Sequence, residues 1–270
     1  MRRPDTVEPD PKNTENFASA AKVSRIGDTP LPTIAVATRK GGTGKTTLAV
    51  HLALAAHLRG LKVVLADADP QRSASEVLRG RVGAGPRHFD TSVLDLETIQ
   101  ARAAASAADL LVIDTPGGPG PILREALPIA DLVLLVSRPT FLDIAAAVRT
   151  QAEARAMGVQ TVIVLNQAPP MRSGAETTAV DSVLEALRTN KLAVSPAIVR
   201  SRTAFQTSMA AGRSVEELGT SPAAADVAAL WDDVRAMLDE ARGGDGAFGR
   251  PTAAAGRRSD AAGISAAGFG

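Results

Sequence analysis

The sequence has no cysteine among its 270 residues, and this absence excludes several classes of protein. Without cysteine there is no disulfide framework, no thiol nucleophile and no iron–sulfur cluster, and a reducing cytosol is the expected compartment. Aromatic residues make up only 3% of the chain, which suits alanine-rich helices packed closely on a sheet. No apolar run approaches the ~18 residues of a membrane span, and the N-terminal stretch lacks the apolar core of a signal peptide. We therefore expect a soluble, cytoplasmic protein.

An excess of charge is missing as well, since the formal net charge is only +1. Any surface that binds nucleic acid must therefore be local. Hydrophobic periodicity is missing from both ends, where residues 1–32 mix charges with prolines and residues 242–270 are rich in Gly, Ala and Ser. We expect two disordered tails around a single folded domain of residues 33–241.

Within this domain, apolar β-branched segments alternate with helical patterns. Such alternation predicts an α/β fold, a doubly wound and mostly parallel sheet with helices on both faces. The expected strands are residues 33–38, 62–66, 109–113, 132–136 and 159–165. The expected helices are residues 48–58, 93–108, a helix from Ile122, and residues 142–157, 177–189, 204–211 and 222–241, the last docked through Trp231.

A glycine-rich stretch, K-G-G-T-G-K-T-T at residues 40–47, lies between the first expected strand and its helix. This context is typical of a phosphate-binding loop, in which backbone N–H groups and a helix N-terminus surround phosphate oxygens. Lys45 would contact the β/γ-phosphates, Thr46 would ligate Mg²⁺, and Thr47 would donate to the α-phosphate. We expect ATP and Mg²⁺ as cofactors. The nucleotide-binding residues would be Gly41, Gly42, Thr43, Gly44, Lys45, Thr46 and Thr47.

Acidic residues follow two of the expected strands. Asp67 and Asp69 lie in D-A-D-P-Q, and Asp114 ends the apolar run D-L-L-V-I before T-P-G-G. Carboxylates at the carboxyl ends of parallel strands lie where such a sheet binds ligands. Asp114 would orient Mg²⁺ in the manner of a Walker B acid, and Asp69 is our candidate for orienting the attacking water. Taken alone, Asp67 and Asp69 could equally be solvated acids at the end of a strand.

The phosphate loop also departs from the general pattern, because Arg39 stands where the first glycine belongs and Lys40 follows it. This resembles the deviant Walker A motif of the ParA/MinD family. The strings L-A-D-A-D-P-Q, L-V-I-D-T-P-G-G, S-R-P-T-F-L-D and V-L-N-Q occur in the family's order, and the resemblance covers about 190 to 200 residues.

The resemblance implies an ATPase in which Lys40 reaches the nucleotide of a second subunit, so that ATP holds a sandwich dimer together. It also implies that Asp67 supports the metal shell, that Asp69 serves catalysis and that Asn166 contacts adenine. Gln167 is a departure, since relatives often have arginine there.

Five basic residues and no acidic ones lie between Arg188 and Arg213. Such a stretch can track a DNA backbone without sequence preference, although a charged run is often only a solvated face. Arg200 and Arg202 are the first candidates, with Arg213 behind them. The ATP-bound protein would then associate with the nucleoid.

The resemblance then implies a ParA-type ATPase that segregates a plasmid or chromosome with a ParB-like or other small adaptor protein that stimulates hydrolysis. The alternatives are positioning of a protein assembly, such as a chemoreceptor cluster or microcompartment, and a metabolic P-loop enzyme. Membrane binding is not expected, because the C-terminal stretch has too few large apolar residues for an amphipathic anchor.

Overall fold

The computed structural model describes residues 31–91, 96–118 and 126–243. The expected tails, apart from residues 31, 32, 242 and 243, and the start of the helix expected from Ile122 lie outside the described residues. Among those that are described, no helix is both long and apolar enough to cross a lipid bilayer.

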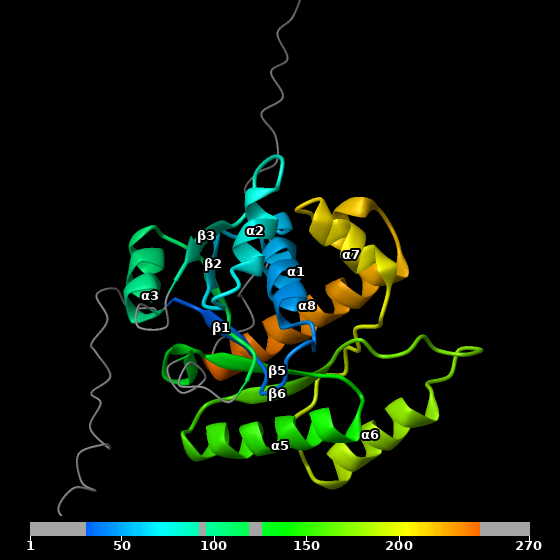
Figure 1. The fold of residues 1–270 in the computed structure, drawn as a ribbon. Helices are drawn as coiled ribbons and strands as arrows, with labels where there is room; N and C mark the ends of the chain where they lie inside the picture. Colours follow the sequence, from blue (N-terminus) through cyan, green and yellow to red (C-terminus); the bar gives the residue numbers. More distant parts are fainter. Residues whose placement is uncertain (1–30, 92–95, 119–125, 244–270) are drawn as a thin grey trace, which may run out of the picture. The chain divides into compact units, whose positions relative to one another are not determined.

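A single parallel sheet forms the centre of the described domain (Figure 1). Its strand order is β3-β2-β4-β1-β5-β6, and every pairing between neighbours is parallel. This confirms the doubly wound fold, in which β1 lies between β4 and β5. The strands are β1 (Thr33–Ala37), β2 (Val63–Asp67), β3 (Arg87–Asp90), β4 (Leu110–Asp114), β5 (Leu132–Ser137) and β6 (Thr161–Leu165).

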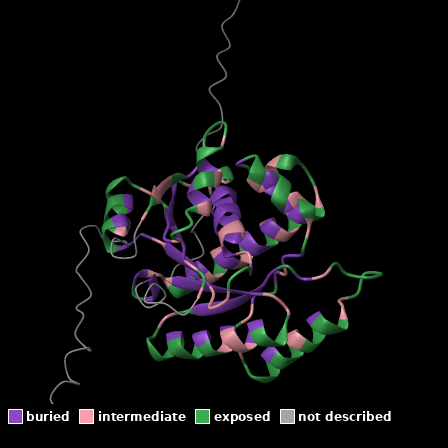
Figure 2. Ribbon diagram, in the orientation of Figure 1, coloured by how far each residue is buried: buried purple, intermediate pink, exposed green. Residues whose placement is uncertain are grey.

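Helices cover both faces of this sheet, because alternate strand residues point to opposite sides. Ile34 and Val36 pack in one apolar cluster with α1, α2, α7 and α8, while Ala35 and Ala37 pack in another with α3, α5 and α6. Figure 2 shows the strands buried and the helices exposed on their outer surfaces. The helices are α1 (Lys45–Leu58), α2 (Ser73–Arg79), α3 (Leu96–Ala105), α5 (Phe141–Ala156), α6 (Thr178–Thr189), α7 (Thr203–Ala210) and α8 (Pro222–Ala241), with the short 3₁₀ segments η3 (Leu127–Ile129) and η4 (Val215–Leu218).

Helix α8 illustrates why the expected elements form. Ser221 caps its N-terminus by accepting a hydrogen bond from the backbone N–H of Ala224, and Pro222 occupies the first helical position. Trp231 is fully buried, as expected for the residue that docks this helix on the body. Its replacement by alanine would cost about 3–5 kcal/mol of stability.

Two elements between residues 71 and 92 were not predicted, namely α2 and β3. Both are short, and β3 has an exposed Arg87 and Asp90 with only partly buried residues between them. It is an edge strand, so its sequence carries no continuous apolar run that would indicate a buried strand.

Candidate functional site at the carboxyl ends of the strands

The loop between β1 and α1 forms the centre of the candidate site. Gly42 and Gly44 have φ values of 76° and 87°, in the left-handed region that favours glycine. Helix α1 begins directly after Gly44, so its first amide N–H groups and the positive end of its dipole adjoin the loop. Gly41 and Gly42 are exposed, whereas Thr43 is buried. The strand–loop–helix geometry expected for this stretch is present, and it can surround a phosphate with backbone donors.

Two side chains after β6 hold the phosphate loop from the other side. The amide nitrogen of Asn166 donates to the backbone oxygen of Thr43 at 2.7 Å, and that of Gln167 donates to Gly42 at 3.2 Å. A Cβ atom on Gly44 would lie 2.4 Å from the Asn166 amide nitrogen, and the φ of 87° itself disfavours any residue other than glycine here. Asn166 therefore braces the loop in this structure. Its contact with adenine stays a prediction.

Lys45 extends from the first turn of α1 into the interior, where it is only 6% exposed. A Cβ atom on Gly117 would lie 3.4 Å from its ammonium nitrogen and 3.3 Å from Cα of Gly41. The loop after β4 therefore packs closely against the phosphate loop. Within the described part of the chain, Lys45 forms no ion pair, so its charge is available to an anionic ligand.

The acids that end β2 and β4 meet because these strands are neighbours in register, with Asp67 opposite Asp114. Both carboxylates are fully buried. The Asp67 oxygens accept hydrogen bonds from the backbone N–H groups of Asp69, at 3.2 Å, and Ser75, at 2.8 Å. Asp69 is only partly buried, and its Oδ1 accepts from the N–H of Gln71 at 2.9 Å. The three acids thus lie together at one edge of the sheet, with Asp69 nearest to solvent.

Asp114 has an unusual environment, since neither of its buried carboxylate oxygens has a hydrogen-bond partner among the described residues. Burial raises its pKa to about 7, and the negative charges of Asp67 and Asp69 act in the same direction. The Thr46 hydroxyl and the Lys45 ammonium lower the pKa but do not outweigh burial. A buried carboxylate without partners is costly unless a cation or donor reaches it.

This arrangement fits Mg²⁺. The unpartnered Asp114 oxygens lie next to the Thr46 hydroxyl, and carboxylate and hydroxyl oxygens are suitable Mg²⁺ ligands. No cluster of three or more acidic or histidine side chains that could hold a metal occurs in residues 31–91, 96–118 and 126–243. The protein groups would therefore share Mg²⁺ with phosphate oxygens and water, as Mg²⁺ sites in nucleotide-binding proteins do.

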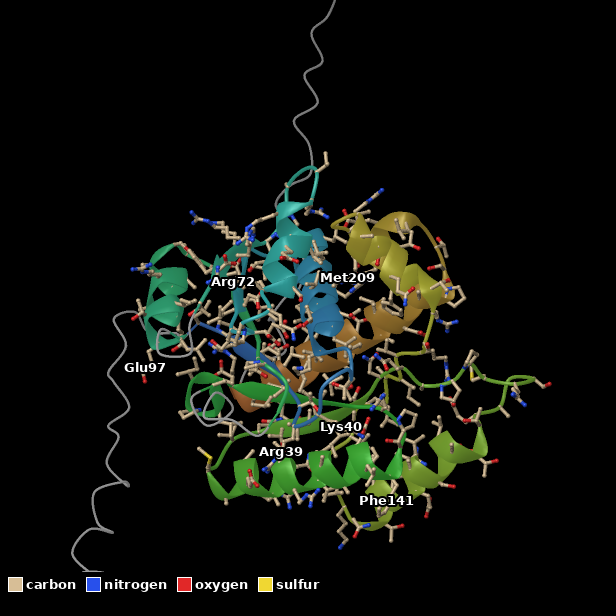
Figure 3. The ribbon with its side chains drawn as sticks, viewed as in Figure 1. Arg39, Lys40, Arg72, Glu97, Phe141 and Met209 are labelled. Carbon is tan, nitrogen blue, oxygen red and sulfur yellow. The ribbon has the colours of Figure 1, made fainter. Side chains whose placement is uncertain are left out.

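Lys40, the other lysine of the loop, lies in different surroundings. The Lys40 ammonium forms an ion pair with Asp143 on α5, and Arg138 reaches the same carboxylate at 2.5 Å. Arg39 pairs with Glu153 further along α5 at 2.6 Å, and Figure 3 shows Arg39 and Lys40 next to this helix. Burial raises the pKa of Asp143, but hydrogen bonds from Arg138 and Lys40 outweigh it and hold the pKa below its usual value. In the single chain, Lys40 is thus turned toward α5.

Sequence reasoning missed Asp143, although it lies in the string S-R-P-T-F-L-D. Thr140 caps α5 by accepting a hydrogen bond from the N–H of Asp143, and an acid in a first helical turn is usual without any further role. Nothing local indicates that Lys40, more than 100 positions earlier, is its partner.

The predicted DNA contact at Arg200 requires a correction. This side chain is only 7% exposed, and its guanidinium pairs with Glu176 and donates to the backbone oxygen of Pro169 at 2.9 Å. A guanidinium that is buried and paired in this way is not accessible to a DNA phosphate. Arg202 pairs with Asp226 at 3.0 Å and is partly exposed. Arg213 is exposed, with one donor on the backbone oxygen of Glu217 at 2.7 Å.

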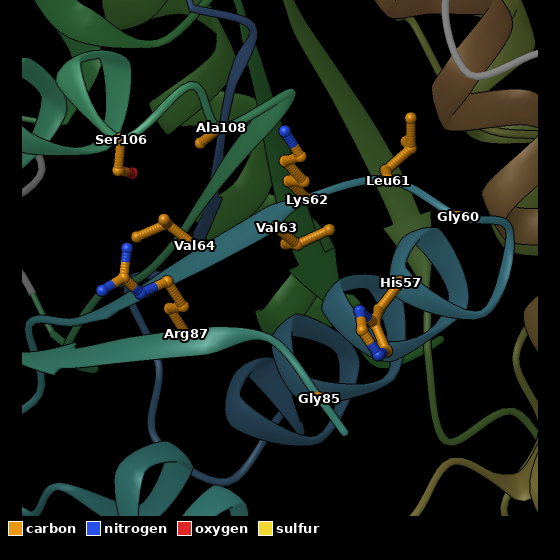
Figure 4. A pocket seen from close by; sticks show the side chains of 10 residues that line it. All are labelled: His57, Gly60, Leu61, Lys62, Val63, Val64, Gly85, Arg87, Ser106 and Ala108. Atoms are coloured by element: carbon orange, nitrogen blue, oxygen red, sulfur yellow. The ribbon is translucent and has the colours of Figure 1, made fainter.

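A pocket of about 380 Å³ lies at the opposite end of β2 from Asp67 (Figure 4). Its lining includes His57, Lys62, Val63 and Arg87. None of the predicted site residues contributes to it. The candidate site is therefore the open edge formed by the strand ends, as expected when a ligand binds to loops at the carboxyl ends of a parallel sheet.

Comparisons with known proteins agree with this geometry. The CbiA family model, the CobQ/CobB/MinD/ParA nucleotide binding domain, matches residues 34–221. The maintenance of carboxysome distribution protein A of Halothiobacillus neapolitanus is 30% identical over 220 residues, which are 77% of this chain and 95% of that protein. Protein ParA of Rhizobium radiobacter is 32% identical over 119 residues, 42% of this chain and 51% of its own length.

Solved structures share the fold. MinD of Pyrococcus horikoshii in complex with Mg-ADP has a TM-score of 0.59 at 17% identity, covering 76% of this chain and 96% of its own. A variant of McdA from Cyanothece in complex with ATP has a TM-score of 0.58 at 16% identity, covering 80% and 98%. The family match spans most of the described domain and includes the phosphate loop, the strand-end acids and Asn166. The chain therefore belongs to the CobQ/CobB/MinD/ParA nucleotide-binding family, as an ATPase of the ParA/MinD type.

Proposed function

We propose that this protein hydrolyses ATP in a Mg²⁺-dependent reaction that drives the positioning of a cargo. The proposal of Mg²⁺-dependent hydrolysis rests on the environment of Asp114. This residue is a buried carboxylate without hydrogen-bond partners, and it lies beside Thr46 and Lys45. A cation bound between Asp114 and the phosphates would remove the cost of burying this charge. Mg²⁺ would supply neutralisation of the phosphate oxygens, as it does in phosphoryl transfer generally.

The residues of the chain then have separate tasks. Lys45 and the loop amides bind the phosphates, and Thr46 with Asp114 holds the metal, supported by Asp67. Asp69 orients the attacking water, because it is the least buried of the three acids and its carboxylate lies at the edge of the site. Hydrolysis of this kind depends on positioning and charge neutralisation rather than on a covalent intermediate.

Phosphate release tests this assignment. The wild-type chain should hydrolyse ATP with Mg²⁺ and lose activity in EDTA, and Asp69→Ala should lose hydrolysis while it still binds ATP. Asp181→Asn is a matched control, because it removes an exposed carboxylate from α6. Full activity of Asp69→Ala would contradict the role given to Asp69.

Lys40 supports dimerisation. Once released from Asp143, its ammonium can stabilise the transferring phosphoryl group of a second subunit, as an arginine finger does. We therefore propose that ATP holds two copies together and that hydrolysis separates them. In light scattering, Asp69→Ala should double its mass when ATP is added, and Asp69→Ala combined with Lys40→Ala should not. An unchanged mass in the first variant would exclude the dimer.

Arg213 supports binding to the phosphate backbone of DNA without sequence preference. It is exposed, and no acidic residue lies between Arg188 and Arg213 in the sequence. Co-sedimentation with plasmid DNA in ATP should weaken as salt rises and should weaken further in Arg213→Glu. Arg102→Glu replaces an exposed arginine on α3, outside the stretch from Arg188 to Arg213, and serves as the control. Equal DNA binding by wild type and Arg213→Glu at low salt would show that Arg213 does not contact DNA.

The cargo has two candidate classes. A plasmid or chromosome, with a ParB-like adaptor that stimulates hydrolysis, is the first. A protein assembly positioned on the nucleoid is the second, and it is favoured by the 30% identity to the carboxysome distribution protein over nearly that protein's whole length. Stimulation of the ATPase by DNA together with an adaptor supports both classes, whereas stimulation by a small metabolite alone would indicate a metabolic enzyme instead.

A further inference from the structure

The pocket of about 380 Å³ at the amino end of β2 has no part in the function proposed above (Figure 4). It forms because the pairing of β2 with β3 begins only at Val64 and Arg87, so the edge of β2 before Val64 has no strand beside it. Residues 60–63 line this open edge together with Gly85. The volume lies in the range of ~300–1,000 Å³ in which proteins bind small molecules.

The walls of the pocket are largely apolar. Val64 is buried on the face of the sheet that α3 covers, and Ala108 packs against the same apolar cluster. Val63 points to the other face, where Leu61 also lines the pocket. Apolar walls with a small number of polar groups are typical of sites for small organic molecules. A ligand that fills this pocket would therefore carry an apolar body.

Two cationic side chains border the pocket on the side of α3. Arg87 lies opposite Val64 in register, and Lys62 precedes Val64 by two residues, so all three side chains share one face of the sheet. Figure 4 shows the side chains of Lys62 and Arg87 on two sides of Val64. Both are exposed. Among the residues that the structure describes, neither forms an ion pair, so both charges are available to a ligand.

Negative groups near the pocket are engaged elsewhere. The Asp109 carboxylate accepts a hydrogen bond from the backbone N–H of Lys62 at 2.8 Å and does not line the pocket. His57 lines the pocket from the end of α1, and its carbonyl accepts from the N–H of Gly60 at 2.9 Å. The partial negative charge of this helix end is thus satisfied by the turn that follows it. The charged border of the pocket is therefore positive.

We propose that this pocket binds a small organic anion whose charged end pairs with Arg87 and Lys62 and whose apolar body covers Val64. The arginine fork offers two parallel N–H donors to a carboxylate, and the lysine adds a compact charge. A concave site with charges of one sign and apolar walls strengthens the attraction of an anion. The inference does not depend on the proposed ATPase, because the nucleotide site lies at the other end of β2.

Amide NMR spectra with benzoate as the probe test this site. Benzoate carries a carboxylate and an apolar ring, whereas acetate has only the first and benzyl alcohol lacks the charge. In the presence of ADP and Mg²⁺, benzoate should shift the amide signals of residues 60–64, 85–87 and 106–108 in a saturable manner. Acetate and benzyl alcohol should bind at least about tenfold more weakly, because each lacks one of the two kinds of contact.

Variants that remove one charge locate the anion. Arg87→Gln and Lys62→Gln should each weaken benzoate binding at least about tenfold, because each removes a charged hydrogen-bond donor. Both side chains are exposed, so the fold should not depend on either. The matched control is Arg188→Gln, which removes an exposed arginine on α6 that does not line the pocket. This control should keep the affinity of the wild type.

Several outcomes would overturn the assignment. Benzoate shifts that do not saturate, or that are confined to residues 40–48, would exclude this pocket; the second result would place the anion at the phosphate loop. Equal affinity for acetate and benzoate would show that the apolar walls make no contact with the ligand. Unchanged affinity in both Arg87→Gln and Lys62→Gln, or an equal loss in Arg188→Gln, would show that these two cations do not hold the anion. Absence of ATP hydrolysis would contradict the proposed function and leave this site untouched.

Discussion

The two lysines of one loop lie in opposite environments. Lys45 is 6% exposed, near the unpartnered carboxylate of Asp114, and forms no ion pair within the described part of the chain. Lys40 is 40% exposed and already paired with Asp143, which Arg138 also holds. The Lys45 ammonium is therefore left for a ligand to pair with. Lys40, in contrast, must break its ion pair with Asp143 before it can contact a phosphate. Nucleotide binding and the action of Lys40 are therefore separable steps.

The largest expected effect is at Lys45. Lys45→Ala should weaken ATP binding by at least about 30-fold, since removing one partner of a buried charge pair costs about 2–5 kcal/mol. Lys40→Ala should change single-chain ATP affinity by less than about threefold, because Lys40 faces α5. Titration calorimetry in the Asp69→Ala background, at a protein concentration where the ATP-bound chain stays a single copy, measures both. An equal loss of ATP affinity in the two variants would show that Lys40 and Lys45 do not have separate roles in nucleotide binding.

The next effect is the pH dependence caused by Asp114. Its folded-state pKa of about 7 lies above the value of 3.8 for an ordinary aspartate, so the unfolded chain loses this proton first. Stability without nucleotide should therefore fall as pH rises from 5 to 8, by about 2–3 kcal/mol for this group. Urea unfolding in EDTA should show this fall in wild type relative to Asp114→Asn.

The comparison with Asp114→Asn is needed because His51, a fully buried residue of α1, acts in the opposite sense. Burial lowers its folded-state pKa to about 4, below the ordinary 6.5, so its contribution is present above pH 6.5 and is lost as pH falls toward 4. The difference between wild type and Asp114→Asn cancels this contribution. A difference that does not vary with pH would exclude the buried-carboxylate interpretation.

A smaller effect is expected at Asp143. Asp143→Asn keeps the shape of the side chain but removes the charge that holds Arg138 and Lys40, so it should lower stability by about 1–2 kcal/mol. It should also favour the ATP-dependent dimer, because Lys40 no longer has to leave a partner. Sedimentation of Asp69→Ala with and without Asp143→Asn measures this change. A weaker dimer would show that Asp143 also contributes to the interface.

The smallest effect is expected at the neighbouring pair of Arg39 and Glu153. Their side chains are 29% and 59% exposed, and exposed ion pairs contribute about 0–1 kcal/mol because water and salt screen them. Glu153→Gln should therefore change stability and dimerisation very little. A loss as large as that of Asp143→Asn would mean that α5 holds the loop as a whole rather than through one carboxylate.

Much of the fold was predictable because it depends on local patterns. The apolar runs that became β1, β2, β4, β5 and β6 stand out from their helices, and the phosphate loop follows from three glycines at fixed spacing. Helix α2 and strand β3 were missed because both are short and β3 lies at the edge of the sheet. The Arg200 contact was wrong because a cluster of arginines in sequence does not reveal that Glu176 buries one of them.

By itself, the sequence determined the family and the position of the phosphate loop. A phosphate loop, an acid after an apolar run and the absence of cysteine are properties of short segments and of composition, and they need no knowledge of distant contacts. Only the tertiary structure decided what each charged residue faces. Whether Lys40 meets Asp143, Asn166 meets the phosphate loop or Asp114 meets no donor depends on residues far apart in the chain, because burial and pairing arise when the sheet brings strand ends together.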